Sequence, residues 1–259
     1  GAWGWARFTR EGESGSMSSG DLVIERFNLA PGRRLGSKYV VGPLLGYGWE
    51  GEVYHVTELA TGVERAAKLF FPQRNPGNRA VRFYATKLDK LQDCPILITY
   101  HTQDTFTYRG TKITFLVSDY VRGELLPAFI ARQPGKRLHA FEGLHLLYPI
   151  AAGLEEIHRR GEYHGDLHLE NVMVERKGLR FEVKLVDLYH WGRRTREHIE
   201  DDVCSAIRLF YDALGGAKWY ESQRPEVKAI CCGLKQSLIV KKFRTAAQLR
   251  RHLETMEWS

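Results

Sequence analysis

Three polar residues in the second half of the chain have the types and spacing needed for metal-assisted chemistry: Asp166, Asn171 and Asp187. Asn171 precedes the apolar run 172–174 and Asp187 follows the apolar run 183–186, so a hairpin of these two runs would bring both residues to one end. Carboxylate and carboxamide oxygens suit Mg²⁺ that also contacts nucleotide phosphates. Asp166 would then orient a hydroxyl group. Each residue alone could be a turn residue or a strand cap, but that interpretation leaves their joint spacing unexplained.

A glycine-rich segment, residues 46–53, has the spacing G-x-G-x-x-G-x-V through Gly46, Gly48 and Gly51. Glycine has no Cβ, so such a backbone can approach phosphate oxygens closely. A purely structural glycine hairpin explains this segment equally well when it is taken alone. Lys68, which lies between apolar neighbours in the next strand-like run, favours the phosphate interpretation because a half-buried cation needs an anion.

Two different patterns surround these residues and predict the elements that position them. From about residue 38 to 120 the chain consists of short runs rich in Val, Tyr, Phe and Thr, with turns at 60–62 and 108–110, which predicts an antiparallel sheet. Apolar residues at three- and four-residue intervals predict one helix inside it, over 78–91. Beyond residue 123 the same spacing predicts helices at 141–160, 202–214 and 248–256. A small sheet followed by a helical body is an α+β layout.

The order of these motifs resembles the protein-kinase superfamily, from the glycine-rich loop and the strand lysine to His164-Gly165-Asp166 and Asp187-Leu188-Tyr189. The resemblance extends over residues 35–254, and its last part is similar to bacterial Ser/Thr kinases. It implies a two-lobed protein-kinase-like fold, with a small antiparallel β-sheet N-lobe carrying one helix at 21–121 and a mostly helical C-lobe at 122–259. Residues 1–20, rich in Gly and Ser, are expected to be a loose tail or a cloning remnant outside the fold.

The resemblance also implies a site for ATP and Mg²⁺. The expected catalytic residues are Asp166 as the base, Lys68 on the α- and β-phosphates, and Asn171. Mg²⁺ would be bound by Asn171 and Asp187. The expected nucleotide-binding residues are Gly46, Gly48 and Gly51 over the phosphates, Val53 and Ala66 around adenine, Ser118 as the gatekeeper behind it, and Asp119, Tyr120 and Val121 as the hinge. A slip of one residue in the strand would instead turn Ser118 to the opposite face of the sheet.

Several positions depart from the family pattern. The helix at 78–91 should carry a glutamate that pairs with Lys68, but its place falls on Tyr84 or Ala85, and Asp89 is the nearest acidic substitute. Gly165 replaces the arginine that would receive a phosphorylated activation loop, and only residues 188–201 separate Asp187 from Asp202. His168 stands where protein kinases usually have lysine, which resembles small-molecule phosphotransferases.

Composition narrows the choice of protein class. The 259 residues are 43% hydrophobic and 27% charged, which is typical of a globular protein. No apolar run is long enough for a membrane span, no secretory signal is expected, and four cysteines without paired spacing fit a cytoplasmic protein. The net charge of +7 is spread along the chain without interleaved aromatic residues, so we expect no nucleic-acid partner.

These observations together predict an ATP- and Mg²⁺-dependent phosphotransferase, a constitutively competent Ser/Thr protein kinase with a shortened activation segment. Its partners would be a nucleotide and an unidentified protein or small-molecule hydroxyl acceptor, with no membrane involved. A pseudokinase, which would keep the nucleotide site for binding or scaffolding alone, is one alternative. A small-molecule kinase is the other.

Overall fold

A computed structural model describes residues 3–4, 23–178, 180–189 and 192–258 of the chain. The chain folds into two compact units. The first unit comprises residues up to Gln92 together with Ile98–Arg122, and the second comprises Asp93–Leu97 and Gly123–Ser259. Apart from Trp3 and Gly4, the expected tail at residues 1–20 lies outside the described residues.

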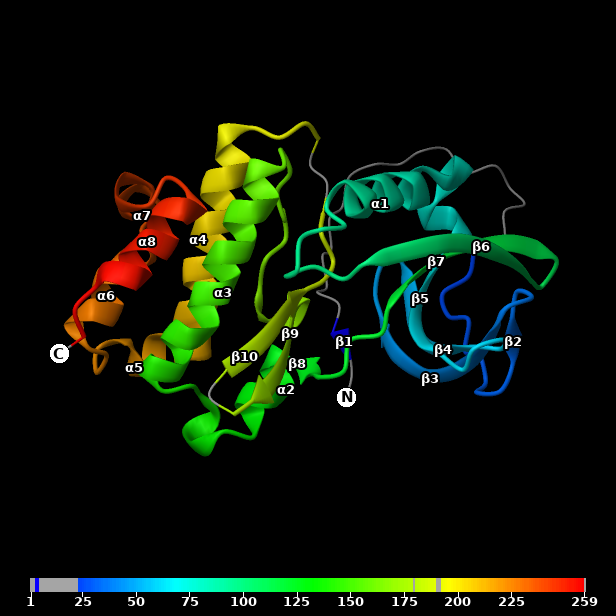
Figure 1. The fold of residues 1–259 in the computed structure, drawn as a ribbon, viewed down its shortest axis with the longest axis horizontal. Helices are drawn as coiled ribbons and strands as arrows, with labels where there is room; N and C mark the ends of the chain where they lie inside the picture. Colours follow the sequence, from blue (N-terminus) through cyan, green and yellow to red (C-terminus); the bar gives the residue numbers. More distant parts are fainter. Residues whose placement is uncertain (1–2, 5–22, 179, 190–191, 259) are drawn as a thin grey trace. The chain divides into compact units, whose positions relative to one another are not determined.

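The first unit is a sheet with one α-helix, as its strand-rich sequence predicts (Figure 1). The strands follow the order β1-β3-β4-β5-β7-β6, and β2 pairs with the first two residues of β3. All neighbours are antiparallel except the short pairing of β1 with β3. The elements are β1 (Trp3–Gly4), β2 (Arg34–Leu35), β3 (Tyr39–Tyr47), β4 (Gly51–Glu58), β5 (Glu64–Phe70), η1 (Pro72–Arg74), η2 (Pro76–Asn78), α1 (Arg79–Lys90), β6 (Tyr100–Tyr108) and β7 (Thr111–Asp119).

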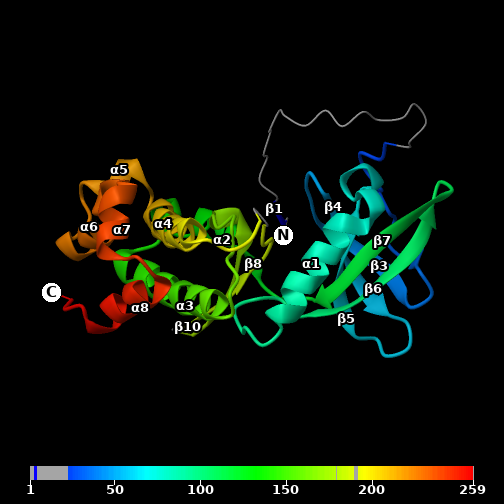
Figure 2. The ribbon, with the colours of Figure 1, turned by 90° about the horizontal axis from the view of Figure 1, so that it is seen from above.

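The turns and the helix of this unit lie where the sequence predicts them. β6 and β7 are joined by the two residues Arg109 and Gly110, both with positive φ, as a tight hairpin turn requires. Helix α1 packs against β6 and β7 (Figure 2). It buries Val81, Tyr84 and Leu88, which recur at helical spacing.

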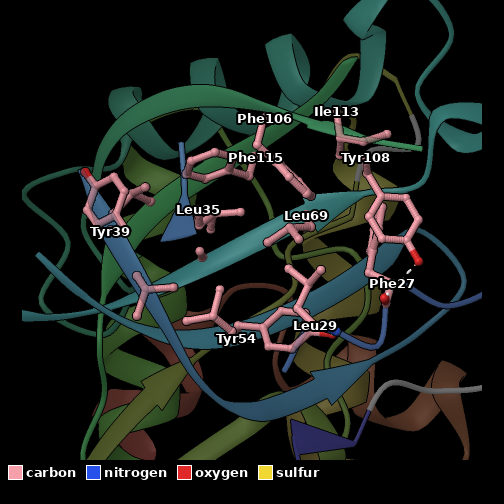
Figure 3. Close-up of a cluster of buried hydrophobic side chains, with 14 of the residues drawn as sticks. Phe27, Leu29, Leu35, Tyr39, Tyr54, Leu69, Phe106, Tyr108, Ile113 and Phe115 are labelled. Carbon is pink, nitrogen blue, oxygen red and sulfur yellow. Dashed lines mark hydrogen bonds between the residues drawn. The ribbon is translucent and has the colours of Figure 1, made fainter. Parts of the chain in front are cut away.

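One face of this sheet carries the apolar core of the first unit. Tyr54, Leu69 and Phe115 project from three neighbouring strands into a cluster that also takes in Phe27 and Tyr108 (Figure 3). The ring of Phe27 stacks on that of Phe71 and meets the edge of Tyr108. Because side chains alternate along a strand, burying this face turns the residues between them to the other face of the sheet.

A buried polar network fixes the segment before β2 to the glycine-rich hairpin. Glu52 is fully buried, and its carboxylate accepts hydrogen bonds from Arg26 Nε at 2.5 Å, from the Phe27 amide at 3.3 Å and from the Tyr54 hydroxyl at 2.6 Å. Burial and the Glu52 hydrogen bond raise the pKa of Tyr54. A buried carboxylate is stable only with such partners, so residues 26–29 are an integral part of this unit.

The second unit is mostly helical, with one small sheet of order β10-β9-β8. Its elements are β8 (Glu124–Leu125), α2 (Leu126–Ala131), η3 (Pro134–Lys136), α3 (Ala140–Arg159), η4 (Leu169–Asn171), β9 (Val172–Lys177), β10 (Arg180–Leu185), α4 (Arg196–Ala213), α5 (Ala217–Tyr220), α6 (Pro225–Cys231), η5 (Cys232–Leu234), α7 (Gln236–Lys242) and α8 (Ala246–Thr255). Helices α3 and α4 run side by side, and α8 packs on α3 (Figure 1). Residues 93–97 lie beside β10, where the Leu185 amide donates to the Ile96 carbonyl at 2.7 Å.

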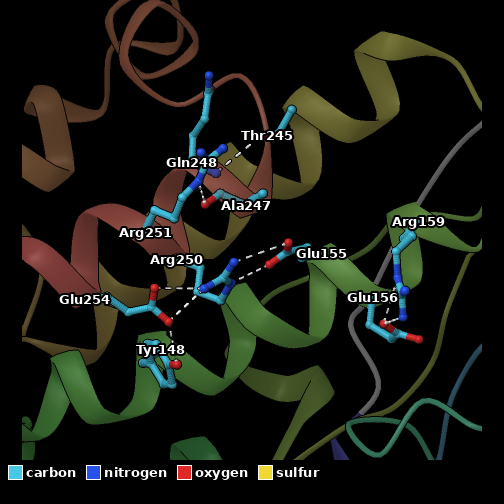
Figure 4. A network of polar contacts seen from close by, with 10 residues as sticks. All are labelled: Tyr148, Glu155, Glu156, Arg159, Thr245, Ala247, Gln248, Arg250, Arg251 and Glu254. Carbon is cyan, nitrogen blue, oxygen red and sulfur yellow. Dashed lines mark hydrogen bonds and ion pairs between the residues drawn. The ribbon is translucent and has the colours of Figure 1, made fainter.

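The contact between α3 and α8 is closed by an arginine-centred network (Figure 4). Arg250 donates to Glu155 on α3 and to Glu254 one turn further along α8, and Glu254 also accepts from the Tyr148 hydroxyl at 2.8 Å. The three helices predicted from the sequence are present, but their ends differ. Helix α4 begins at Arg196 rather than at residue 202, because Thr195 and His198 form a capping box ahead of the apolar positions.

Candidate functional site

Four of the predicted nucleotide-binding residues share the face of the first-unit sheet opposite its apolar core. In the register, Val53 pairs with Lys68 across β4 and β5, and Ala66 pairs with Ser118 across β5 and β7. Directly paired residues project to the same face, and residues two apart on one strand do so as well. Val53, Ala66, Lys68 and Ser118 therefore line one surface, and Ser118 does not point into the core.

The glycine-rich segment forms a tight connection between β3 and β4. The Gly48 amide donates to the Gly51 carbonyl at 2.9 Å, so residues 48–50 make the turn. A Cβ on Gly51 would lie 1.8 Å from the Leu69 carbonyl oxygen, so close packing of β4 on β5 alone requires glycine there. Strand packing thus explains the glycine at position 51, in addition to the phosphate role inferred from the motif.

The contacts of Lys68 in the first unit include the carboxylate of Glu50 and the rings of Tyr84 and Phe70. The lysine side chain is buried, and Nζ donates to Glu50 Oε2 at 2.8 Å. The same Nζ lies 4.1 Å from the ring centroid of Tyr84 on α1 and 5.2 Å from that of Phe70. Tyr84, rather than Ala85, is therefore the helix residue that faces the lysine, whereas Asp89 is exposed.

The predicted hinge begins at the end of β7. The Asp119 amide donates to the Thr99 carbonyl at 3.0 Å, and its carboxylate pairs with His101 Nε2 at 2.6 Å. Burial acts to raise the pKa of Asp119, but the hydrogen bonds to His101 and Thr99 outweigh it and leave that pKa below its usual value. The Tyr120 ring meets His55 edge-on at 4.7 Å, and Val121 follows it, half-buried. Side chains thus fix the start of this segment.

In the second unit the predicted catalytic residues lie in one hydrogen-bonded loop before β9. Asn171 is buried, and its Nδ2 donates to the Asp166 carbonyl at 2.7 Å and to Asp166 Oδ2 at 3.3 Å. His168 Nε2 lies 3.6 Å from the same carboxylate oxygen, while His168 Nδ1 accepts from the Glu170 amide. The hydrogen bond from Asn171 orients the Asp166 carboxylate. Because Asp166 is only half-buried, its carboxylate is also accessible.

Asp187 follows β10, and the predicted hairpin of β9 and β10 places it next to Asn171. Val172 pairs with Leu185, and the Val186 amide donates to the Asn171 carbonyl at 3.0 Å. Asp187 has φ 59°, in the left-handed region that Asp tolerates better than most residues. One carboxamide and one carboxylate at the same hairpin end match the donors of a Mg²⁺ ion whose other ligands are phosphates and water. Within the described residues, no group of three or more His, Cys, Asp or Glu side chains is placed to hold a metal alone.

A residue without a predicted role holds this loop in place. Asp202 on α4 is buried, and it accepts hydrogen bonds from the His164 amide at 2.7 Å and the Gly165 amide at 2.9 Å. His158 Nε2 lies 2.9 Å from the same carboxylate. Burial acts to raise the pKa of Asp202, but these partners lower it below its ordinary value. An acidic residue on the apolar face of a predicted helix was the sequence signal for this anchor.

The backbone explains the glycine at position 165. Gly165 has φ 83°, and an added Cβ would meet the Tyr189 carbonyl oxygen at 2.9 Å and the Tyr163 ring at 3.0 Å. An arginine would be strained in this conformation. Residues 188–195 separate Asp187 from α4, a connection shorter than the one predicted because the helix starts earlier.

The predicted site residues belong to two different units. The glycine-rich segment, Lys68 and the hinge lie in the first unit. Asp166, Asn171 and Asp187 lie in the second unit. Glu50, the carboxylate partner of Lys68, was missed by the sequence reasoning. Its signal was an acidic residue inside the glycine-rich segment itself.

Comparison with known proteins places this arrangement in a family. The sequence profile described as the protein kinase domain matches residues 39–213. A probable serine/threonine-protein kinase of Streptomyces coelicolor is 32% identical over 158 residues, which cover 60% of this chain and 23% of that protein. CBL-interacting protein kinase 17 of Oryza sativa subsp. japonica is 35% identical over 144 residues, covering 54% of this chain and 30% of that protein. The chain thus matches less than a third of the length of either relative.

The fold is shared with a solved bacterial structure. The Mycobacterium tuberculosis PknI kinase domain matches with a TM-score of 0.61 at 20% identity, covering 87% of this chain and 97% of that one. No helix among the described residues is long and apolar enough to cross a membrane. The two-lobed kinase fold expected from the sequence is confirmed, and this chain belongs to the protein kinase domain family.

Proposed function

We propose that this chain is an ATP- and Mg²⁺-dependent phosphotransferase that acts on a serine or threonine hydroxyl of a protein. The observation that carries the proposal is the loop in which buried Asn171 holds Asp166 by two hydrogen bonds while Asp202 fixes the loop backbone. A base in such a loop has a set position and an accessible carboxylate, which general-base chemistry requires.

Each residue has a defined task in this proposal. Asp166 orients the acceptor hydroxyl and takes its proton, and Lys68 binds the α- and β-phosphates of ATP. Asn171 and Asp187 are the protein ligands of Mg²⁺, which when bound neutralises charge on the phosphates. Val53, Ala66 and Ser118 border adenine, and residues 119–121 pair with it through their backbone. Electrostatics and positioning account for most of the rate enhancement of such a transfer.

The proposal includes activity without a phosphorylation switch. Residues 188–195 are too few for a long regulatory loop, and Gly165 offers no guanidinium to a phosphate. Thr195, the hydroxyl residue nearest α4, is already used as its N-cap. Four free thiols fit a reducing, cytoplasmic compartment.

Two observations support the alternatives. Tyr84 at the place of the helix glutamate is what a pseudokinase would tolerate, and His168 beside Asp166 resembles small-molecule phosphotransferases. A pseudokinase would bind nucleotide without phosphoryl transfer. A small-molecule kinase would transfer phosphate to a soluble hydroxyl compound in preference to protein.

The test is phosphoryl transfer from γ-labelled ATP with Mg²⁺, comparing the wild type with Asp166→Ala. We expect label on a generic protein acceptor such as casein or on the chain itself, and a loss of at least about 100-fold in Asp166→Ala because general-base catalysis contributes that much. Glu182→Gln on β10, which removes an exposed carboxylate of the same unit, is the matched control and should retain activity. Transfer by Asp166→Ala at the wild-type rate would contradict the assignment, and label found only on small hydroxyl compounds would favour the second alternative.

A further inference from the structure

Lys68 has an anionic partner in the same segment that is proposed to cover the phosphates. Glu50 Oε2 accepts a hydrogen bond from Lys68 Nζ at 2.8 Å, and the Glu50 side chain retains 26% exposure against 9% for Lys68. A buried ammonium group is stable only when a negative or polar group compensates for its lost hydration. In this state Glu50 contributes to that compensation.

The backbone holds Glu50 close to β5. The Glu50 carbonyl accepts from the Phe71 amide at 2.9 Å, and the turn is closed by the bond between Gly48 and Gly51. The carboxylate therefore reaches Lys68 from a short turn anchored at both sides. Because the side chain is partly exposed, a change of rotamer can return the carboxylate to water without moving the anchored backbone.

The helix side of Lys68 is covered by an aromatic ring. Nζ lies 4.1 Å from the centroid of Tyr84, a distance typical of a cation–π contact, which favours the charged lysine without supplying a negative charge. Tyr84 is buried in α1, so it stays in place when Glu50 moves. The ring holds the lysine, and the carboxylate occupies one of its hydrogen-bond donors.

We propose that Glu50 is an internal competitor for the nucleotide phosphates, exchanged for them when ATP binds, while Tyr84 keeps Lys68 in position in both states. The proposal rests on the phosphate-binding role of Lys68 given above. Two anions that hydrogen-bond to one ammonium group lie within a few ångströms of each other and repel, so the phosphate displaces the mobile carboxylate. Tyr84 is a positioning residue here, and Glu50 sets the affinity for phosphate-bearing ligands.

The experiment measures dissociation constants by calorimetry for a non-hydrolysable ATP analogue with Mg²⁺ and for adenosine. We expect Glu50→Gln to bind the analogue about fivefold more tightly, which corresponds to ~1 kcal/mol. Adenosine carries no phosphate, so its affinity should not change. In a Lys68→Met background, Glu50→Gln should have no effect, because the group for which carboxylate and phosphate compete is absent.

Removing the ring of Tyr84 on α1 should have the opposite effect on analogue affinity from removing the Glu50 carboxylate. Tyr84→Leu should weaken binding of the analogue about threefold, within the range of one cation–π contact, whereas Tyr84→Phe keeps the ring and should restore the affinity. Glu58→Gln, which removes an ion-paired carboxylate at the far end of β4, is the matched control and should change the affinity for neither ligand. Glu50→Ser serves as a second variant, and thermal unfolding verifies that every variant is folded.

The outcomes separate this inference from the function on which it rests. Weaker or unchanged analogue binding in both Glu50 variants, or equal tightening for adenosine, overturns the competition while the kinase assignment stands. If the single variant Lys68→Met binds the analogue as tightly as wild type, the phosphate role of Lys68 is overturned, and the inference with it.

Discussion

Ser118 lies opposite Ala66 in the sheet, on the same face as Lys68 and Val53. A slip of one residue would have turned it toward the apolar cluster of Phe115 and Val117, which are its neighbours along β7. Its side chain is small and half-buried, and its hydroxyl lies 3.5 Å from the Asp119 carbonyl oxygen. In the proposed nucleotide site, a residue of this size near the end of β7 would leave space beside adenine.

We predict that Ser118→Phe excludes adenine analogues with a bulky group on the exocyclic nitrogen while ATP still binds. The phenyl ring fills the space that serine leaves open, so analogue affinity should fall at least about tenfold, or ~1.4 kcal/mol. Competition binding against ATP measures this. Val117→Ala, on the opposite face, is the control and should alter stability rather than selectivity. Equal analogue binding by wild type and Ser118→Phe would remove Ser118 from the nucleotide site and require a new hinge assignment.

At the scale of elements, helix α4 acts as the support for the loop that carries Asp166. Its carboxylate Asp202 accepts two backbone hydrogen bonds from residues 164 and 165 and pairs with His158 of α3. One buried side chain thus connects two helices and the loop. The His164 ring adds a contact with the Val186 carbonyl at 3.1 Å, which joins the loop to the segment leading to Asp187.

We predict that Asp202→Ala lowers the free energy of unfolding by about 3 kcal/mol, because the substitution removes a buried carboxylate with three hydrogen-bond partners and leaves those buried groups unsatisfied. Activity should fall as well, since the loop backbone loses two acceptors. Denaturant unfolding with a parallel kinase assay measures both. Asp201→Ala, at the neighbouring exposed position on the same helix, is the control. Wild-type stability in Asp202→Ala would show that the anchor is dispensable.

The same carboxylate gives the stability a pH dependence with a definite sign. The pKa of Asp202 is lower in the folded protein than in the unfolded chain. Its contribution is therefore complete above the ordinary aspartate pKa of about 3.9 and is lost as the pH falls through the lower folded value. Unfolding curves between pH 5 and pH 3 should show a smaller decrease for Asp202→Ala than for wild type, and equal decreases would contradict this role.

For the whole molecule, nucleotide binding should stabilise the fold in a metal-dependent way. A ligand at about 100 times its dissociation constant adds ~2.7 kcal/mol to the free energy of unfolding, or about 5–10 °C in Tm for a chain of this size. We predict that ATP with Mg²⁺ raises Tm by more than ATP with EDTA, and that Asp187→Asn removes the difference. Thermal shift measures this, with Glu182→Gln as the control. The same shift with Mg²⁺ and with EDTA would rule out the metal role of Asn171 and Asp187.

Much of the chain's organisation could be read from sequence because it depends on local patterns. Runs rich in Val, Tyr, Phe and Thr, with turn residues between them, predict the strands and the turn at Arg109 and Gly110, and the spacing of Val81, Tyr84 and Leu88 predicts α1. The hairpin that places Asn171 beside Asp187 also follows from two short apolar runs. In each case the interacting groups are close along the chain or repeat at a fixed period.

Only the tertiary structure decided which distant groups meet. The carboxylate that pairs with Lys68 comes from Glu50 in a turn rather than from α1, and the loop anchor Asp202 lies 38 residues beyond its partner His164. Helix α4 begins at Arg196 because Thr195 and His198 cap each other, a contact that apolar spacing does not register. Side-chain pairing across strands and helices depends on register and packing, which are global properties of the fold, and a periodic pattern contains no information about them.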